Sequence, residues 1–276
     1  MTTQPRRRNR FPLWVSLSLL GNVICLLSLS FLLLKGKPLP SVPQANASSE
    51  TRNPPPSPQL GPRHQLTYDQ WVELLGREAQ VAADKRSRRL TILLGDSLSL
   101  WFPPQLLPTD RTWLNQGISG ETSAGLFRRL DLFDRTKPET IFLLIGINDL
   151  IRGVDDQTIL QNQERIIRYL KRTHPQTQIV VQSLLPHAAA GAKWEGRDRL
   201  QGTPNSRIRN LNRELAAITR AADVYYLDLH SLFTDPKGNL LPELTSDGLH
   251  LSLQGYWVWR SALQTFSQLE LEQAKR

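Results

Sequence analysis

The 276-residue chain contains one cysteine, so it cannot form an intrachain disulfide. That residue, Cys25, lies inside an apolar N-terminal run, and we interpret it as a buried apolar side chain. Asn22, Val23 and Ile24 in front of it are not the small residues that a lipid-attachment site requires. The folded part of the chain must therefore be stabilised by its own hydrophobic core, which about 210 residues are enough to supply.

Sequence motifs for metal and nucleotide chemistry are also missing. There is no H-E-x-x-H, no pair of cysteines with zinc spacing and no G-x-x-x-x-G-K-[ST] loop. Asp149, Asp155 and Asp156 could suggest a cation site, but we interpret them as parts of a loop and a helix N-terminus. We therefore expect no metal and no other cofactor.

The excess of positive charge is concentrated near the N-terminus, where few acidic residues balance the basic ones. The formal net charge is +9, which would suit a nucleic-acid-binding protein. Residues 1–66, however, hold eight of the 34 bases and one of the 25 acids, which leaves 26 bases and 24 acids for residues 67–276. The basic run at 85–89 is typical of a solvated helix end. We therefore expect no nucleic-acid partner.

One long uncharged run, from Phe11 to Leu34, stands near the N-terminus. As a helix its 24 residues would span about 36 Å, enough for a hydrocarbon core of about 30 Å. Four arginines in residues 1–10 favour a cytoplasmic tail, and hence a transmembrane signal anchor at 11–34 with the remaining chain in the periplasm or at the cell surface. A signal peptide cleaved after Ala47 is the alternative, although that site lies well beyond the run.

The segment after this run is rich in proline. Residues 35–66 contain eight of the 19 prolines and almost no apolar periodicity. This composition predicts a semi-extended linker between a membrane and a folded domain at 67–276.

From Thr67 onward, apolar runs alternate with amphipathic segments. The apolar runs predict strands at 90–94, 113–114, 140–145, 178–184 and 224–229. Helical spacing predicts helices at about 67–83, through Leu126, Leu130 and Phe133, and at 159–170, 208–222 and 253–269. This alternation indicates an α/β protein with a parallel sheet of about five strands and helices on both faces. Ligands then bind at the carboxyl ends of the strands.

Three polar segments follow predicted strands. In Gly95-Asp96-Ser97, a serine at a strand-to-helix turn can present its hydroxyl at the edge of the sheet. Gly120 permits close approach of backbone, so that its N–H can point into a cleft, and Asn148 offers two amide protons to a developing oxyanion. Taken alone, each segment is equally consistent with a turn, a loop or a helix cap.

A fourth segment, Asp247-Gly248-Leu249-His250, precedes the last predicted helix. An imidazole deprotonates a serine only when it is held in one tautomer, which a carboxylate bound to its other nitrogen achieves. A separation of three residues in a loop allows Asp247 to fold back on His250. A lone histidine is more often structural, but of the five histidines only His250 has an acid and a glycine in such tight context.

Together the four segments resemble the SGNH, or GDSL, hydrolase family, because they occur in that family's order. The similarity covers about Leu90 to the C-terminus, and it is greatest to the short thioesterase/lysophospholipase-like and acetylhydrolase-like branches. The serine motif is not the G-x-S-x-G of α/β-hydrolases. The resemblance implies a three-layer flavodoxin-like fold and the activity of an esterase or lipase, a carboxylic ester hydrolase.

The same resemblance implies roles for individual residues. Ser97 would be the nucleophile, His250 the base and Asp247 the acid that orients it. The backbone N–H groups of Ser97 and Gly120 and the side chain of Asn148 would form the oxyanion hole.

The substrate is less defined. Expected substrates are acyl esters of small molecules, lipids or glycans, such as acetylated glycans, lysophospholipids or short acyl esters. Asp96, His187 and Trp194 are the predicted pocket residues, and Trp194 either stacks on a sugar or acyl chain or covers the core. The alternatives are a catalytically silent SGNH-like module that binds glycan or lipid at the membrane, and a structural membrane adaptor, which would not need Asp247 and His250.

Overall fold

A computed structural model describes residues 66–273, which belong to one compact unit, Leu60–Arg276. The predicted cytoplasmic tail at 1–10, the predicted anchor at 11–34 and the predicted linker up to residue 65 lie outside the described residues. Within 66–273, no helix is both long enough and apolar enough to cross a membrane.

The centre of the domain is a parallel sheet of five strands. The strands are β1 (Leu90–Gly95), β2 (Thr112–Gly117), β3 (Thr140–Leu144), β4 (Gln178–Gln182) and β5 (Tyr225–Leu227). Their order in the sheet is β2-β1-β3-β4-β5, and every neighbouring pair is parallel. This is the flavodoxin-like order, in which the chain changes direction between β1 and β3, and ligands bind at that point.

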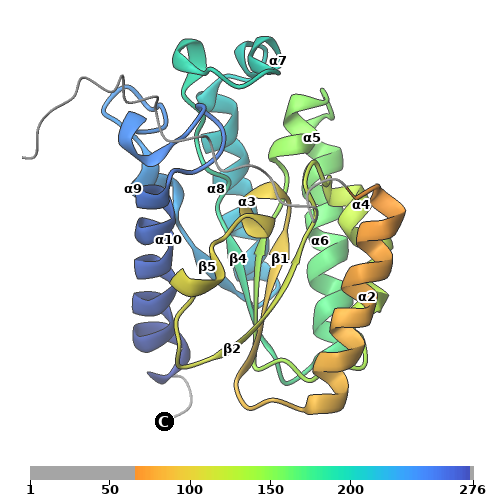
Figure 1. Cartoon of the computed structure of the whole chain (residues 1–276). Coiled ribbons are helices and arrows are strands. Elements are labelled where there is room, and N and C mark those ends of the chain that lie inside the picture. The colour runs from red at the N-terminus through yellow and green to blue at the C-terminus, as the bar shows by residue number, and fades with distance from the viewer. Residues whose placement is uncertain (1–65, 274–276) are drawn as a thin grey trace, which may run out of the picture. The chain divides into compact units, whose positions relative to one another are not determined.

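Helices cover both faces of the sheet, as predicted (Figure 1). The longer ones are α2 (Tyr68–Lys85), α6 (Asp156–Thr173), α8 (Asn205–Ala221) and α10 (Leu253–Phe266). Short helices are α3 (Ser97–Leu100), α4 (Ser123–Arg128), α5 (Ile147–Ile151), α7 (Arg197–Gln201) and α9 (His230–Phe233). Helices α2, α4, α6 and α8 pack on one face, and α10 packs on the other, so that the domain has three layers.

The alternation of side chains along the central strands supplies both halves of the core. Leu93 and Phe142 point to the α10 face, where they join the buried Trp259. Ile92 and Ile141, one position away on the same strands, point to the opposite face. Both faces of β1 and β3 are therefore dry, which explains why their sequences are apolar without interruption.

Local sequence signals set several helix boundaries. The capping box predicted at Thr67 is present, because the Thr67 hydroxyl accepts from Gln70 N at 3.3 Å and the Gln70 side chain accepts from Thr67 N at 2.8 Å. The last helix is shorter than predicted, since α10 ends at Phe266 and a π turn, Ser267–Leu271, follows.

Two other predicted elements were wrong in detail. Leu126, Leu130 and Phe133 are all buried in one cluster, but they are not on one helix, because α4 ends at Arg128 and a separate 3₁₀ turn, Leu130–Phe133, follows. The fifth strand ends at Leu227 rather than at 229. There the Ser183 hydroxyl accepts from the backbone N–H groups of both Leu229 and His230, at 2.8 and 2.7 Å, and the chain turns into α9.

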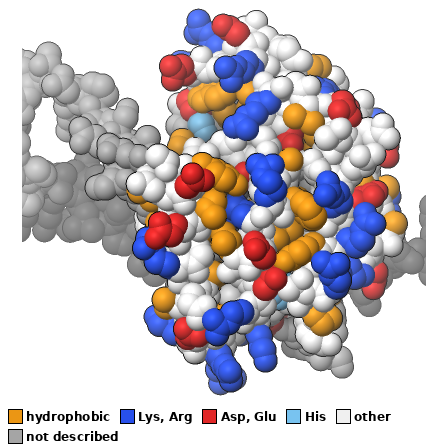
Figure 2. Space-filling model, turned by 90° about the vertical axis from the view of Figure 1, so that its right-hand side faces the viewer, with side chains coloured by type: hydrophobic (Ala, Val, Ile, Leu, Met, Phe, Trp, Pro, Cys, Tyr) orange, Lys and Arg blue, Asp and Glu red, His pale blue; other side chains and the backbone are white. Residues whose placement is uncertain are grey.

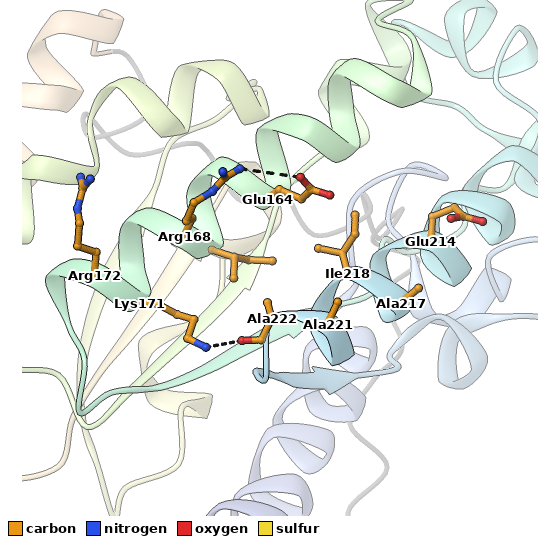
Figure 3. Close-up of a pocket in the computed structure, with 10 residues that line it drawn as sticks. Glu164, Arg168, Lys171, Arg172, Glu214, Ala217, Ile218, Ala221 and Ala222 are labelled. Atoms are coloured by element: carbon orange, nitrogen blue, oxygen red, sulfur yellow. Dashed lines mark hydrogen bonds and ion pairs between the residues drawn. The ribbon is translucent and has the colours of Figure 1, made fainter.

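The outer surface of the helical layer is mixed in charge. Figure 2 shows Lys and Arg side chains interspersed with Asp and Glu on the face that it presents. An open groove also lies between α6 and α8, lined by Arg168 and Lys171 of α6 and by Glu214, Ala217 and Ile218 of α8 (Figure 3). Its lining includes none of the predicted catalytic residues.

Candidate active site

Ser97 lies where β1 meets α3, at the carboxyl edge of the sheet. The strand ends at Gly95, and Asp96 caps the helix by accepting from Leu98 N at 3.0 Å. This turn is packed too tightly for a side chain at Gly95, since a Cβ there would lie 2.2 Å from the Leu144 carbonyl oxygen. The nucleophile position predicted from the sequence is therefore held between β1 and β3, the strands on either side of the topological switch.

His250 and Asp247 reach this serine from the loop before α10. The Nε2 atom of His250 lies 3.2 Å from Ser97 Oγ, and its Nδ1 atom lies 2.7 Å from Asp247 Oδ2. The carboxylate accepts from Nδ1–H, which leaves the lone pair of Nε2 facing the hydroxyl. Both Ser97 and His250 are buried, so these contacts are shielded from bulk water.

The Asp247 loop is folded onto its own backbone. Asp247 Oδ1 accepts from the backbone N–H groups of Leu249 and His250 at 2.9 and 2.7 Å. Burial raises the pKa of Asp247, but hydrogen bonds from the His250 side chain and backbone outweigh it and hold the pKa below its ordinary value. The carboxylate is thus ionised, which suits a group that must stabilise an imidazolium.

Gly248 is required by this loop for two reasons. Its φ of +94° is in the region that L side chains rarely adopt, and a Cβ would lie 2.5 Å from Ala192 Cα. Its carbonyl accepts from Ala188 N at 2.8 Å, and the Asp247 carbonyl accepts from the N–H groups of Lys193 and Trp194. The connection after β4 is therefore hydrogen-bonded to the loop that carries Asp247 and His250.

The segment with Gly120 forms a tight turn next to the serine. Glu121 N donates to Ile118 O at 3.2 Å, and Gly120 takes a φ of +74° at the third position, where such a turn requires glycine. Arg152 donates to the Gly120 carbonyl at 2.7 Å. Within residues 66–273, the backbone N–H groups of Ser97 and Gly120 donate to no protein atom, so both remain available to a ligand.

Asn148 follows β3 on α5, and it is linked to the same turn. Its Nδ2 atom donates to the Glu121 carbonyl at 3.0 Å, which uses one of its two amide protons. Next to it, buried Asp149 accepts from Ser123 N at 2.8 Å and from Ser123 Oγ at 2.6 Å. The two loops that carry the predicted oxyanion donors are thus joined by direct hydrogen bonds.

Comparison with known proteins agrees with this geometry. The model of the GDSL-like Lipase/Acylhydrolase family matches residues 83–258, a range that includes all the residues above from Gly95 to His250. The chain belongs to this family. The family resemblance inferred from the sequence is therefore confirmed.

Similar proteins come from several bacteria. An arylesterase from Vibrio mimicus is 34% identical over 105 residues, which make up 33% of this chain and 52% of the arylesterase, so that the match spans about half of that relative. A Streptococcus pneumonia structure that carries the name platelet activating factor is 28% identical, covers 72% of this chain and 95% of its own, and has a TM-score of 0.61. A GDSL-like lipase from Bacteroides thetaiotaomicron, 18% identical with a TM-score of 0.61, shares the fold over 72% of this chain and 97% of its own.

Two of the three predicted pocket residues do not reach the surface. Asp96 is fully buried, and burial raises its pKa to about 7, with Asp149 and Glu121 adding to the effect and the Leu98 N–H opposing it. His187 is also buried, with Nε2 2.6 Å from Thr203 O and Nδ1 accepting from Ala189 N at 3.0 Å. Both ring nitrogens are occupied by backbone, so His187 supports the connection after β4 and offers no nitrogen to a substrate.

Trp194 is half-buried. The sequence left open whether it contacts a substrate or covers the core. Its ring packs against the cluster that contains Ile147 and Leu150, and a Cβ at Gly196 would lie 2.3 Å from it. Trp194 therefore does cover part of the core, while the rest of its surface is open to solvent.

The structure also reveals residues of the site that the sequence interpretation missed. The ring of Trp101 packs on the imidazole of His250, with centroids 4.2 Å apart and an angle of 38° between the planes. Trp101 follows Ser97 by four residues, which is one helical turn, so its position next to Ser97 could have been inferred from spacing. Arg129 is buried next to the Gly120 turn and pairs with Glu121, and its sequence surroundings gave no such signal.

Proposed function

We propose that this chain hydrolyses carboxylic acyl esters, with Ser97 as nucleophile, His250 as general base and Asp247 as the acid that orients it. The observation that carries the proposal is the continuous chain of contacts from Asp247 through His250 to Ser97, 2.7 and 3.2 Å long. The carboxylate that fixes the tautomer is ionised, and its only role is electrostatic and positional.

The proposed reaction has two halves. His250 Nε2 takes the hydroxyl proton as Ser97 Oγ attacks the carbonyl carbon, and the resulting tetrahedral oxyanion accepts from Ser97 N–H, Gly120 N–H and Asn148 Nδ2. Collapse of this intermediate breaks the bond to the alcohol oxygen, which receives the proton from His250 and leaves an acyl–serine ester. Water, deprotonated by His250, attacks that ester in the same way, and the acid leaves as Ser97 recovers its proton.

The test uses a fluorophosphonate probe together with p-nitrophenyl acetate. Wild-type protein should hydrolyse the ester and become labelled at Ser97, whereas folded Ser97→Ala protein should do neither. Hydrolysis at the wild-type rate by folded Ser97→Ala would refute the mechanism. A wild-type protein that neither turns over nor labels would favour the catalytically silent module that binds glycan or lipid.

The substrates we propose are acetylated glycans, lysophospholipids or short acyl esters. The half-buried ring of Trp194 supports a role for the connection after β4 in choosing among them, because its backbone N–H is bonded to the Asp247 carbonyl. Trp194→Ala should then change relative rates across an acyl and sugar-ester series more than it changes the melting temperature. The opposite result would make Trp194 a cover of the core and nothing more.

We further propose that the enzyme is tethered to a membrane by residues 11–34 and acts outside the cytoplasm. The support is in the sequence alone: an uncharged run of 24 residues preceded by four arginines. N-terminal sequencing of the exported protein tests this proposal. A mature chain that begins at Ser48 would refute the anchor and leave the proposed chemistry untouched.

A further inference from the structure

Below the Gly120 turn lies a buried ion pair that the proposed reaction does not use. Arg129 Nε donates to Glu121 Oε2 at 2.7 Å, and the two side chains are only 2% and 3% exposed. Gly125 is required by this pair, since a Cβ there would lie 1.8 Å from Glu121 Oε1. Removing both charges from water costs more than a well-packed apolar pair would, so stability alone does not explain the pair.

The guanidinium also contacts the ends of two strands. Arg129 Nη2 donates to Gln116 O at 3.0 Å and lies 3.4 Å from Gly95 O, the last carbonyl of β1. Gly95 stands two residues before Ser97, whose N–H is one oxyanion donor. One arginine therefore links the turn that carries the nucleophile to the neighbouring strand.

Through Glu121 the same arginine is linked to the other two donors. Gly120, whose N–H is the second donor, directly precedes Glu121. The Glu121 carbonyl accepts from Asn148 Nδ2 at 3.0 Å, which orients the amide that is the third donor. The segments that carry Ser97 and Gly120 thus meet at the Arg129 side chain, and Asn148 is linked to it through the backbone of Glu121.

We propose that Arg129 is a positioning residue that sets the relative positions of the three oxyanion donors. This inference rests on the proposed ester hydrolysis. The planar guanidinium, with several donors in a fixed fork, binds a carboxylate and two carbonyls at once, which a lysine ammonium cannot do in the same geometry. Oxyanion donors stabilise the transition state only when they are aimed at it beforehand, so their spacing is reflected in kcat. The break between α4 and the following 3₁₀ turn, at Arg129, is consistent with this role.

The main test is the double variant Glu121→Gln/Arg129→Met. It removes both charges together, so that neither is left buried without a partner. The assay is run well below the melting temperature of the variant. There, kcat for p-nitrophenyl acetate should fall by about 10–100-fold while KM changes by less than about threefold. The reason is that donors misplaced by up to about 1 Å stabilise the transition state less well. Unchanged kcat in this folded variant would overturn the inference.

A second buried arginine provides the matched control. Arg111, 2% exposed, donates from Nη1 to Thr91 Oγ1 and Thr140 Oγ1 at the opposite, amino edge of the sheet. Arg111→Met should lower the melting temperature as an Arg129 substitution does, with kcat unchanged at low temperature. Equal losses of kcat in the two variants at equal loss of stability would reduce Arg129 to a structural role and overturn the inference.

The effect of Asn148→Ala on kcat, measured in two backgrounds, distinguishes a positioning role of Arg129 from a general loss of stability. If Arg129 acts through the donors, Asn148→Ala should cost less in the Glu121→Gln/Arg129→Met background than in wild type. Losses that simply multiply would overturn the inference. If the double variant does not fold, Arg129→Lys replaces it, because it keeps the charge opposite Glu121 and removes the fork, and the same fall in kcat is expected. Failure of the proposed function itself would be distinct: wild type would be inactive, or Ser97→Ala active.

Discussion

The carboxyl edge of the sheet and its amino edge use different residues for the same backbone conformation. At the carboxyl edge three positions with positive φ are glycines, Gly120 at +74°, Gly146 at +134° and Gly248 at +94°, and another, Ala189 at +49° in the connection after β4, is not. At the amino edge such positions are polar residues that are exposed or half-exposed: Arg86 at +46°, Arg89 at +51° and Asp223 at +52°. Of the three glycines, Gly248 also leaves no room for a side chain, since a Cβ there would lie 2.5 Å from Ala192 Cα.

The two edges also differ in how their polar side chains are paired. The carboxyl edge buries Asp96 with one carboxylate oxygen, Oδ2, that has no hydrogen-bond partner within residues 66–273. At the amino edge, Arg89 pairs with Asp110, Glu139 and Glu272 at 3.0, 3.4 and 2.7 Å. The carboxyl edge thus holds a buried carboxyl beside the proposed nucleophile, whereas the amino edge is joined by ion pairs at the surface and by the buried Arg111. Substitutions at the first edge should affect activity most, and those at the second should affect stability alone.

The largest effect is expected at Ser97, the proposed nucleophile. Ser97→Ala should abolish covalent turnover, and adding His250→Ala should lower the remaining rate only slightly, because the two side chains act as a unit. Steady-state rates of the two single variants and the double variant measure this, with circular dichroism to confirm folding. A double variant slower than Ser97→Ala by a further large factor would mean that His250 does not act through Ser97.

Loss of one oxyanion donor should cost less. Asn148→Ala leaves the nucleophile and base in place, so kcat should fall by about 10²–10³-fold, or roughly 2.7–4 kcal/mol. The variant should still be labelled slowly by a fluorophosphonate at Ser97. Since the Asn148 amide also donates to the Glu121 carbonyl, its melting temperature must be measured alongside. Activity equal to wild type would remove Asn148 from the oxyanion hole.

The buried Asp96 should give the carboxyl edge a dependence of stability on pH. Its pKa is raised to about 7, so folding favours the protonated form. Its contribution to stability is complete below the pKa of about 3.9 in the unfolded chain and is lost as pH rises through about 7, by up to about 1.4 kcal/mol per pH unit. Urea unfolding between these two pH values should show this decline in wild type, and Asp96→Asn should flatten it. Parallel curves for the two proteins would contradict a raised pKa.

The sequence was sufficient to predict which residues come together when they are close in the chain or lie at the ends of strands. Asp247 and His250 are three residues apart, and a loop of that length with Gly248 brings them together. The uninterrupted apolar runs of β1 and β3 predicted buried parallel strands, whose carboxyl ends must meet at one edge. Family resemblance then supplied the roles that spacing alone left open.

What the sequence did not reveal depends on where side chains point after folding. Arg129 lies within the helix predicted through Leu126, Leu130 and Phe133, yet its guanidinium lies next to the Gly120 turn and binds Glu121. His187 stands after a strand like a pocket residue, but the backbone of its own connection occupies both ring nitrogens. Neither outcome is encoded by local periodicity, because each depends on contacts between segments that are distant in sequence or folded back on themselves.

The smallest effect is expected at the amino edge, where Arg89 pairs with three acids. Arg89→Asn removes these ion pairs, and asparagine is among the residues that best tolerate the left-handed φ of +51° at this position. Because the partners are 26–50% exposed, the loss of stability should be about 1 kcal/mol at low ionic strength, and it should shrink as salt is added. Urea unfolding of wild type and variant at low and high NaCl measures it. The value of kcat/KM should be the same in both proteins, since Arg89 touches no loop at the carboxyl edge. A tenfold fall in kcat/KM in the folded variant would show that the two edges are coupled and that the contrast between them is incomplete.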